Sequence, residues 1–237
     1  MVELIIAEKP KAAQKIAEAL ADGKAIKENI NGVPYYKVTH GNKDILVGCA
    51  VGHLFGLKQK SSKSTIPEFN IEWVPSSEVN KKSDFSKKYA NALKKLSKQA
   101  NEFTVAADYD VEGEVIGLNI IRYICKKKDA NRMKFSTLTK PDIVKAYKTK
   151  SKHLDWGQAN AGETRHKLDW FYGINTSRAL TNAIRSTGVF KIMSSGRVQG
   201  PALKLVVDKE KEIKKFISTP FWQIELQGKA KTVPIVG

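Results

Sequence analysis

The 237 residues include 41 Lys and Arg against 24 Asp and Glu, a formal net charge of +17, and 41% of them are hydrophobic. This length and composition allow one or two globular domains and exclude a collagen-like, mucin-like or wholly disordered chain. The apolar runs are far shorter than the roughly 20 residues of a membrane-spanning helix, and charges interrupt the first run too early for a signal peptide. We therefore expect a cytoplasmic protein with no membrane partner.

The first third of the chain predicts a strand, a helix and further strands. Residues 2–7 are apolar and β-branched, and Pro10 follows at a position that the first turn of a helix tolerates. Apolar residues then recur at helical spacing as far as Leu20. Further strands are predicted at residues 35–39, 44–51 and 71–74.

The middle of the chain predicts a second strand and helix unit. Residues 80–98 contain seven lysines, and apolar residues at spacings of four, four and three predict an amphipathic helix with a basic outer face. Residues 103–107 then predict a buried strand. The remaining predicted elements are helices at residues 115–124 and after residue 140, a strand at 133–136 and a long helix at 159–186.

Alternating strands and helices favour an α/β fold with a mainly parallel sheet and flanking helices. We place a first domain at residues 1–150 and the start of a mainly helical region at residues 151–237, where lysines become fewer and three of the four tryptophans lie. Such sheets carry their chemistry at the carboxyl ends of strands. Acidic residues follow two of the predicted strands, at Glu8 and from Asp108 onward.

The basic excess favours an anionic partner. A charge of this size is costly in self-repulsion and commonly serves to attract a polyanion, so nucleic acid is the leading partner. A lysine-rich solvated surface without such a partner is the alternative. Cys49 and Cys125 are too few for a disulfide framework or a four-ligand zinc site, which favours a reducing compartment.

The most informative stretch carries four carboxylates within seven residues: Asp108, Asp110, Glu112 and Glu114. They repel one another unless a cation lies among them, and Mg²⁺ prefers oxygen ligands of this kind. In an extended segment Asp108 and Asp110 point the same way, and Glu8 supplies a further carboxylate if the two strands are neighbours. The alternative is that the acids cap the following helix, whose dipole favours negative charge at its start.

Four motifs occur in order along the chain. They read A-E-K-P at residues 7–10, D-x-D-x-E-G-E at 108–114, R-x-x-x-D-W with G-I-N-x-S-R-A-L-T at 165–181, and S-G-R-V-Q-G-P at 195–201. Together they resemble a type IA DNA topoisomerase, especially the archaeal topoisomerase I and topoisomerase III branch, whose first motifs form a Toprim domain of Rossmann-like fold. The acidic motif alone is shared with other Toprim enzymes, such as primases and nucleases. The later motifs count against these.

The resemblance implies a reaction in which a tyrosine attacks a phosphodiester of single-stranded DNA, leaving a 5′-phosphotyrosyl bond while another strand passes. It implies Glu8 as general acid, Lys9 as a cation near the scissile phosphate, and Mg²⁺ bound by Glu8, Asp108, Asp110 and Glu112. ATP is not required, in agreement with the lack of a G-x-x-x-x-G-K-[ST] loop. We expect a monomer that associates with the nucleoid.

The later motifs supply candidate DNA contacts. Arg165 and Asp169 are four residues apart on a predicted helix, so they can pair on one face and direct the guanidinium towards a phosphate; a solvated helix pair is the alternative. An arginine such as Arg197, in a turn bounded by glycine and proline, can contact phosphate bidentately. The resemblance implies that Arg165 and Asp169 position DNA near the nucleophile, with Arg165 in a catalytic role. It implies that Ser195, Arg197 and Gln199 contact the single strand.

Two features depart from the family pattern. Val111 stands where bacterial members carry an arginine, so any phosphate contact from that position must come from elsewhere. Nothing in the chain matches the G-x-x-[ST]-Y-x-R-T segment that carries the nucleophilic tyrosine. We therefore interpret the chain as the N-terminal part of a longer enzyme, inactive in relaxation by itself. A non-catalytic DNA-binding module is the remaining alternative.

Overall fold

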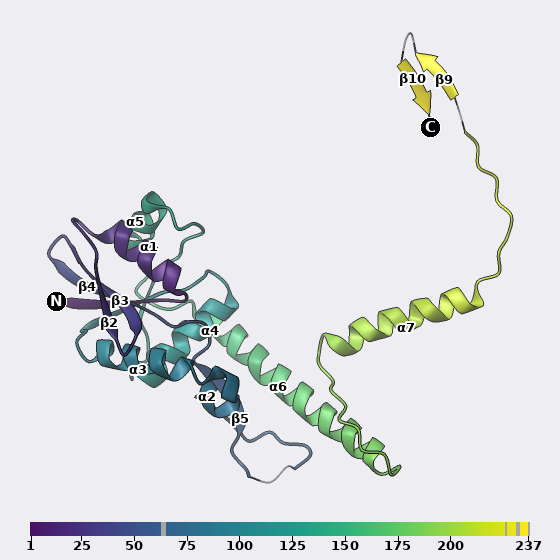
Figure 1. Ribbon diagram of the computed structural model, residues 1–237, viewed down its shortest axis with the longest axis horizontal. Helices are drawn as coiled ribbons and strands as arrows, with labels where there is room; N and C mark the ends of the chain where they lie inside the picture. Colours follow the sequence, from purple (N-terminus) through teal and green to yellow (C-terminus); the bar gives the residue numbers. More distant parts are fainter. Residues whose placement is uncertain (63–64, 226, 231–232, 237) are drawn as a thin grey trace. The chain divides into compact units, whose positions relative to one another are not determined.

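The computed structural model describes residues 1–62, 65–225, 227–230 and 233–236 (Figure 1). The chain forms two compact units, Met1–Ser194 and Ser195–Gly237. The domain boundary predicted at residue 150 lies within the first unit and stays a prediction. No helix in the described part of the chain is both long enough and apolar enough to span a membrane.

A six-stranded sheet organises the first unit, with the strands in the order β2-β3-β4-β1-β7-β8. The central strand β1 pairs in parallel with β4 and β7, β8 extends the sheet in parallel, and β2, β3 and β4 are antiparallel. The strands are β1 (Val2–Ala7), β2 (Ile26–Ile30), β3 (Val33–His40), β4 (Lys43–Cys49), β7 (Glu102–Ala106) and β8 (Asn131–Arg132). The predicted α/β class with a largely parallel core is confirmed.

Helices cover both faces of this sheet, because β1 is apolar on both of its faces. Ile5 and Ala7 pack with α1 and α5, whereas Leu4 and Ile6 pack with α3 and α4. The helices of the first unit are α1 (Pro10–Leu20), α2 (Ser76–Val79), α3 (Ser86–Ser97), α4 (Val111–Asn119), α5 (Lys140–Lys148) and α6 (Trp156–Arg185). A 3-10 helix η1 (Lys81–Ser83), a π-helix η2 (Ile120–Ile124) and a separate hairpin of β5 (Phe55–Gln59) and β6 (Ile71–Pro75) complete it.

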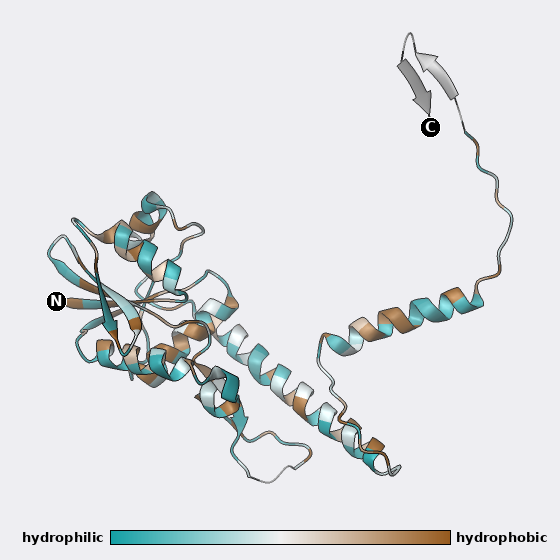
Figure 2. Ribbon diagram, in the orientation of Figure 1, coloured by the Kyte–Doolittle hydropathy of each residue, from teal (hydrophilic) through white to brown (hydrophobic). Residues whose placement is uncertain are grey.

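The second unit contains α7 (Gln199–Lys215) and a hairpin of β9 (Gln227–Ala230) and β10 (Val233–Val236). Figure 2 shows a largely apolar stretch followed by a charged one along α7. The sequence predicts that Arg197 and Gln199 of the S-G-R-V-Q-G-P motif flank Val198 in a turn. The structure instead begins α7 at Gln199, so that only the first part of the motif is irregular.

The strand predicted at residues 133–136 is wrong. Strand β8 covers only Asn131 and Arg132, which pair with Thr104 and Val105 of β7. Met133 donates one further hydrogen bond to the Val105 carbonyl, at 2.9 Å. Because β7 ends at Ala106, the following residues have no strand to pair with, and the chain leaves the sheet. The predictions also missed β2 and β5, whose polar residues and glycine weaken the alternating pattern.

Glycine allows α6 to pack directly against the first turn of α4. A methyl group at Gly162 would lie 2.7 Å from the Val111 carbonyl oxygen and would also clash with the Val115 side chain. Gly117 likewise allows α4 to approach β7, since a methyl group there would lie 2.5 Å from Val105 Cγ1. Helix α4, which begins within the acidic segment, is therefore packed closely between β7 and α6.

We expect Gly162→Ala to lower the free energy of unfolding by about 1–3 kcal/mol, because the added methyl group overpacks the α4–α6 contact. Urea denaturation measures the change. Gly23→Ala is the matched control, since a methyl group at Gly23 has nothing within 4 Å. An equal effect of the two substitutions would contradict this account of the packing.

Candidate functional site

The ends of two neighbouring strands bring Glu8, Lys9 and Asp108 together. Ala7 of β1 pairs with Ala106 of β7, so the residues that follow both strands emerge at the same edge. Glu8 Oε2 accepts a hydrogen bond from the Asp108 backbone N–H at 3.3 Å. Lys9 Nζ lies 2.8 Å from Asp108 Oδ2 and 3.1 Å from Glu8 Oε1. One ammonium group thus bridges the two carboxylates.

The electrostatics of this trio favour a permanent positive charge on Lys9. Hydrogen bonds to Asp108 and Glu8 raise the pKa of Lys9 well above its usual range. The Lys9 side chain is 60% exposed, whereas that of Glu8 is 13% exposed. The site therefore presents a fixed cation to solvent with a nearly enclosed carboxylate beside it.

Asp110 is directed differently from Asp108. It is the N-cap residue of α4, and its Oδ1 accepts a hydrogen bond from the Gly113 backbone N–H at 2.7 Å. The helix-capping alternative therefore describes Asp110 correctly. A hollow of about 460 Å³ adjoins the same loop. Its lining comprises Asp108, Tyr109, Asp110, Phe135, Ser136 and Leu138.

Glu112 faces α6 and two histidines. Its Oε2 lies 3.0 Å from His53 Nε2 and 2.8 Å from His166 Nε2, and its Oε1 lies 3.6 Å from Arg165 Nη1. Burial raises the pKa of Glu112, but the hydrogen bond to His166 and the neighbouring positive charges outweigh it, so the pKa is lowered overall. Burial and the proximity of His166 lower the pKa of His53. Neither His53 nor His166 was predicted from the sequence as a site residue.

The four predicted metal-binding carboxylates are not gathered around one point. Within the described residues, the group with three donor atoms all within 4.8 Å of one another is His53, Glu112 and His166. Glu8 and Asp108 nevertheless fit a divalent ion, because they already share one cation, the Lys9 ammonium group. Mg²⁺ commonly uses only one or two protein carboxylates together with water.

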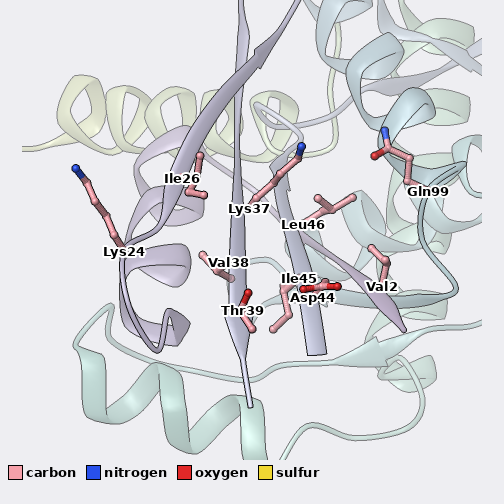
Figure 3. Close-up of a pocket in the computed structure, with 10 residues that line it drawn as sticks. All are labelled: Val2, Lys24, Ile26, Lys37, Val38, Thr39, Asp44, Ile45, Leu46 and Gln99. Carbon is pink, nitrogen blue, oxygen red and sulfur yellow. The ribbon is translucent and has the colours of Figure 1, made fainter. Parts of the chain in front are cut away.

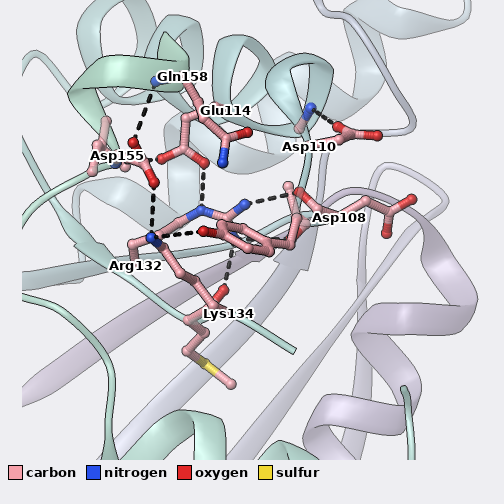
Figure 4. A network of polar contacts seen from close by, with 12 residues as sticks. Asp108, Asp110, Glu114, Arg132, Lys134, Asp155 and Gln158 are labelled. Atoms are coloured by element: carbon pink, nitrogen blue, oxygen red, sulfur yellow. Dashed lines mark hydrogen bonds and ion pairs between the residues drawn. The ribbon is translucent and has the colours of Figure 1, made fainter. Parts of the chain in front are cut away.

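Glu114 forms a fully buried ion pair with Arg132 (Figure 4). Arg132 Nε donates to Glu114 Oε2 at 2.6 Å, and its two terminal nitrogens donate to the backbone carbonyls of Ala107, Asp108 and Met133 at 2.6–2.8 Å. Glu114 Oε1 also accepts from the Asp155 backbone N–H at 2.6 Å. The pair therefore fixes the backbone on both sides of Asp108. No local pattern marks Arg132 in the sequence.

Lys134 links the acidic loop to the start of α6. Its Nζ lies 2.8 Å from Asp155 Oδ2 and 4.7 Å from the centre of the Tyr109 ring. Asp155 in turn caps α6 by accepting a hydrogen bond from the Gln158 backbone N–H at 3.3 Å. Figure 4 also draws the contacts of Lys134 and Asp155. Through Lys134, Tyr109 is linked to the start of α6.

The motif on α6 has two sets of contacts. Arg165 Nε lies 3.9 Å from Asp169 Oδ2, so the predicted pairing of these side chains on one helix face is observed. Further along, Asn175 exchanges hydrogen bonds with the backbone N–H and carbonyl of Glu68, at 2.8 and 3.0 Å. Arg178 donates to the Thr65 carbonyl at 3.3 Å. Asn175 and Arg178, in the second half of the motif, therefore hold the segment that contains Thr65 and Glu68 against α6.

The remaining predicted DNA contacts lie in the second unit. Ser195 and Arg197 precede α7, and Gln199 is its first residue. Their roles stay predictions.

A separate hollow of about 390 Å³ lies at the opposite end of the sheet (Figure 3). Val2 and Asp44, which line it, begin β1 and β4 or lie next to their first residues, whereas Glu8 follows the last residue of β1. It contains none of the predicted site residues and therefore takes no part in their chemistry.

Comparison with known proteins decides the family. The chain matches the Toprim domain family over residues 3–138 and the DNA topoisomerase family over residues 153–234. The chain belongs to the Toprim domain family. It is 53% identical over 227 residues to DNA topoisomerase 1 of Methanocaldococcus jannaschii and 49% identical over 226 residues to that of Pyrococcus furiosus.

These matches cover 95% and 94% of the chain but only 29% and 21% of the two relatives. The full-length topoisomerase I of Thermotoga maritima has a similar structure, with a TM-score of 0.61 and 26% identity over 90% of this chain and 31% of that one. The chain thus spans about a third or less of the length of these topoisomerases. Toprim domains bind divalent metal ions, in agreement with the donor chemistry of Glu8 and Asp108.

We expect Arg132→Met to lower the free energy of unfolding by about 3–5 kcal/mol, because it leaves Glu114 buried without its partner. Arg122→Met is the matched control. Arg122 is 37% exposed and pairs with Glu163 at 3.5 Å, so its loss should cost about 1 kcal/mol or less. Urea denaturation of the two variants measures both values, and a similar small cost for each would show that the buried pair does not hold the loop.

Proposed function

We propose that the protein acts in Mg²⁺-dependent, ATP-independent breakage, passage and rejoining of single DNA strands through a 5′-phosphotyrosine. The observation that supports this most strongly is the meeting of Glu8, Lys9 and Asp108 at the ends of β1 and β7. An acid, a fixed cation and a metal-binding carboxylate converge there beside a hollow large enough to admit part of a nucleotide chain.

Each member of the trio has a role suited to its environment. Lys9 stays protonated because of its raised pKa, so it contributes charge at the scissile phosphate and does not transfer protons. Glu8, when protonated, donates a proton to the leaving 3′-oxygen. A divalent ion held there would supply positive charge to the phosphate oxygens. Glu8 and Asp108 would hold the ion, with Asp110 and Glu112 as further carboxylates of the set.

DNA binding would involve both parts of the chain. In this proposal residues 1–150 form the Toprim domain and residues 151–237 begin the DNA-binding region. Arg165 and Asp169 would position the single strand near the attacking tyrosine, and Ser195, Arg197 and Gln199 would contact the strand further along. The net charge of +17 supports attraction to DNA. The protein would act as a monomer in the cytoplasm, on nucleoid DNA.

The main alternative is another Toprim enzyme, a primase or a nuclease. The match to the DNA topoisomerase family over residues 153–234 favours the topoisomerase. An assay for covalent capture of DNA distinguishes the topoisomerase from the primase and the nuclease, because only the topoisomerase forms a protein–DNA bond. Primer synthesis or free cleavage products without covalent capture would support the alternative.

We expect Lys9→Met and Asp108→Asn each to lower the rate of plasmid relaxation about 100-fold or more in a protein that carries this chain at the full length of its relatives. Lys9→Met removes a positive charge that stabilises the transition state, and Asp108→Asn removes a carboxylate that would hold the metal ion. Lys11→Met is the matched control, since Lys11 is an exposed lysine on α1 two residues further on. Relaxation that survives both site substitutions would refute the assigned roles.

Binding of single-stranded DNA by the 237-residue chain should weaken with salt. The logarithm of the affinity should fall linearly with the logarithm of salt concentration, with a slope of roughly −0.7 for each phosphate contact. Arg165→Gln should then reduce the slope by about one contact. Fluorescence anisotropy of a labelled oligonucleotide measures the slopes, and an affinity independent of salt would exclude electrostatic binding.

A further inference from the structure

Three elements that are distant in the sequence present two imidazoles and one carboxylate to each other. His53 lies between β4 and β5, Glu112 is in the first turn of α4, and His166 is in the middle of α6. Both His Nε2 atoms approach the same carboxylate oxygen, at 3.0 and 2.8 Å. The donor atoms of all three lie within 4.8 Å of one another.

We propose that His53, Glu112 and His166 bind one divalent transition-metal ion, with Zn²⁺ as the natural occupant. Two histidines and one glutamate are a ligand set that zinc sites use when a fourth position stays open for water or another ligand. Imidazole suits zinc, copper, nickel and iron, whereas Mg²⁺ prefers oxygen donors alone. The site shares Glu112 with the proposed magnesium set, but its two imidazole donors make it chemically distinct from the Glu8 and Asp108 pair.

Backbone contacts hold the first ligand in place. Val51 and Gly52 adopt left-handed conformations, with φ of 62° and 85°, that turn the chain just before His53. The Gly52 N–H donates to the Glu8 carbonyl at 3.2 Å, and the His53 carbonyl accepts a hydrogen bond from Ser76 Oγ at 2.8 Å. His53 is therefore fixed on both sides.

The other two ligands are fixed by the contact between helices. His166 lies four residues, or about one helical turn, beyond Gly162, where α6 meets the first turn of α4 at backbone distance. Glu112 is in that same turn. Arg165 lies 3.6 Å from Glu112 Oε1, which leaves Oε2 to the two imidazoles. The close packing of α6 against α4 therefore also brings Glu112 and His166 together.

The cysteines do not compete for such an ion. Cys49 and Cys125 are both buried, and burial raises their pKa values to about 11 and about 12. Both therefore remain thiols at neutral pH, whereas metal binding requires the thiolate. Absorption by bound Co²⁺ should accordingly show no thiolate charge-transfer band.

The test is titration of the 237-residue chain with Zn²⁺ and with Co²⁺, in the presence of excess Mg²⁺. We expect one ion per chain by calorimetry and the visible absorption of four- or five-coordinate Co²⁺. Trp73 provides a local reporter, because its ring lies 5.6 Å from that of His166. Bound Co²⁺ should quench Trp73 fluorescence, and Trp73→Phe should remove the quenched component.

Substitutions assign the ligands. His53→Gln, His166→Gln and Glu112→Gln should each weaken binding by at least about tenfold, the lower end of the loss that even outer contacts of metal sites cause. His153→Gln is the matched control, since His153 pairs with Asp129 outside this group. Asp108→Asn should also leave Zn²⁺ affinity unchanged, because Asp108 belongs to the other site.

The outcomes are decisive in both directions. Lack of stoichiometric binding, or undiminished affinity in folded His53→Gln and Glu112→Gln, would overturn the proposal. Circular dichroism identifies any variant that fails to fold. In that case the Zn²⁺ affinities of the other two ligand variants test the proposal. Loss of Zn²⁺ affinity in Asp108→Asn would assign the ion to the Toprim carboxylates instead. None of these measurements involves DNA, so they stand apart from the success or failure of the proposed enzymatic function.

Discussion

A single buried guanidinium group determines where the acidic loop lies. Arg132 binds the carbonyls of Ala107, Asp108 and Met133, all just beyond the ends of β7 and β8, where the sheet no longer supplies hydrogen-bond partners. Buried backbone groups require such partners, and a buried cation requires a counter-charge, which Glu114 supplies. The position of Asp108 beside Glu8 and Lys9 therefore depends on an interaction that takes no part in the chemistry.

Close packing extends this order from the sheet to α6. Gly117 allows α4 to lie against β7, Gly113 lies against the Asp108 carbonyl, and Gly162 brings α6 onto the start of α4. Because these three contacts leave no room even for a methyl group, the sheet, α4 and α6 have little freedom to slide past one another. The arrangement places Arg165 and His166 next to Glu112, so the α6 motif and the acidic motif are in direct contact.

Local patterns in the sequence predicted the α/β class, but they placed Glu8 beside Asp108 only on the condition that their two strands are neighbours. Two apolar strands followed by acids imply a shared edge whenever the strands are parallel neighbours, and β1 and β7 are. The patterns did not reveal Arg132 as a buried clamp, the approach of His53 and His166 to Glu112, or the Asn175 contact with Glu68. These contacts join residues 18 to 107 positions apart, and no periodicity encodes them.

The four acids of the D-x-D-x-E-G-E motif meet different environments. Asp108 lies in extended chain, Asp110 caps α4, and Glu112 and Glu114 lie within its first turn. Residues two apart on a helix are separated by about 200°, so Glu112 and Glu114 must face opposite sides. One meets the histidines and the other meets Arg132. Mutual repulsion among the four acids is thus relieved by separate partners.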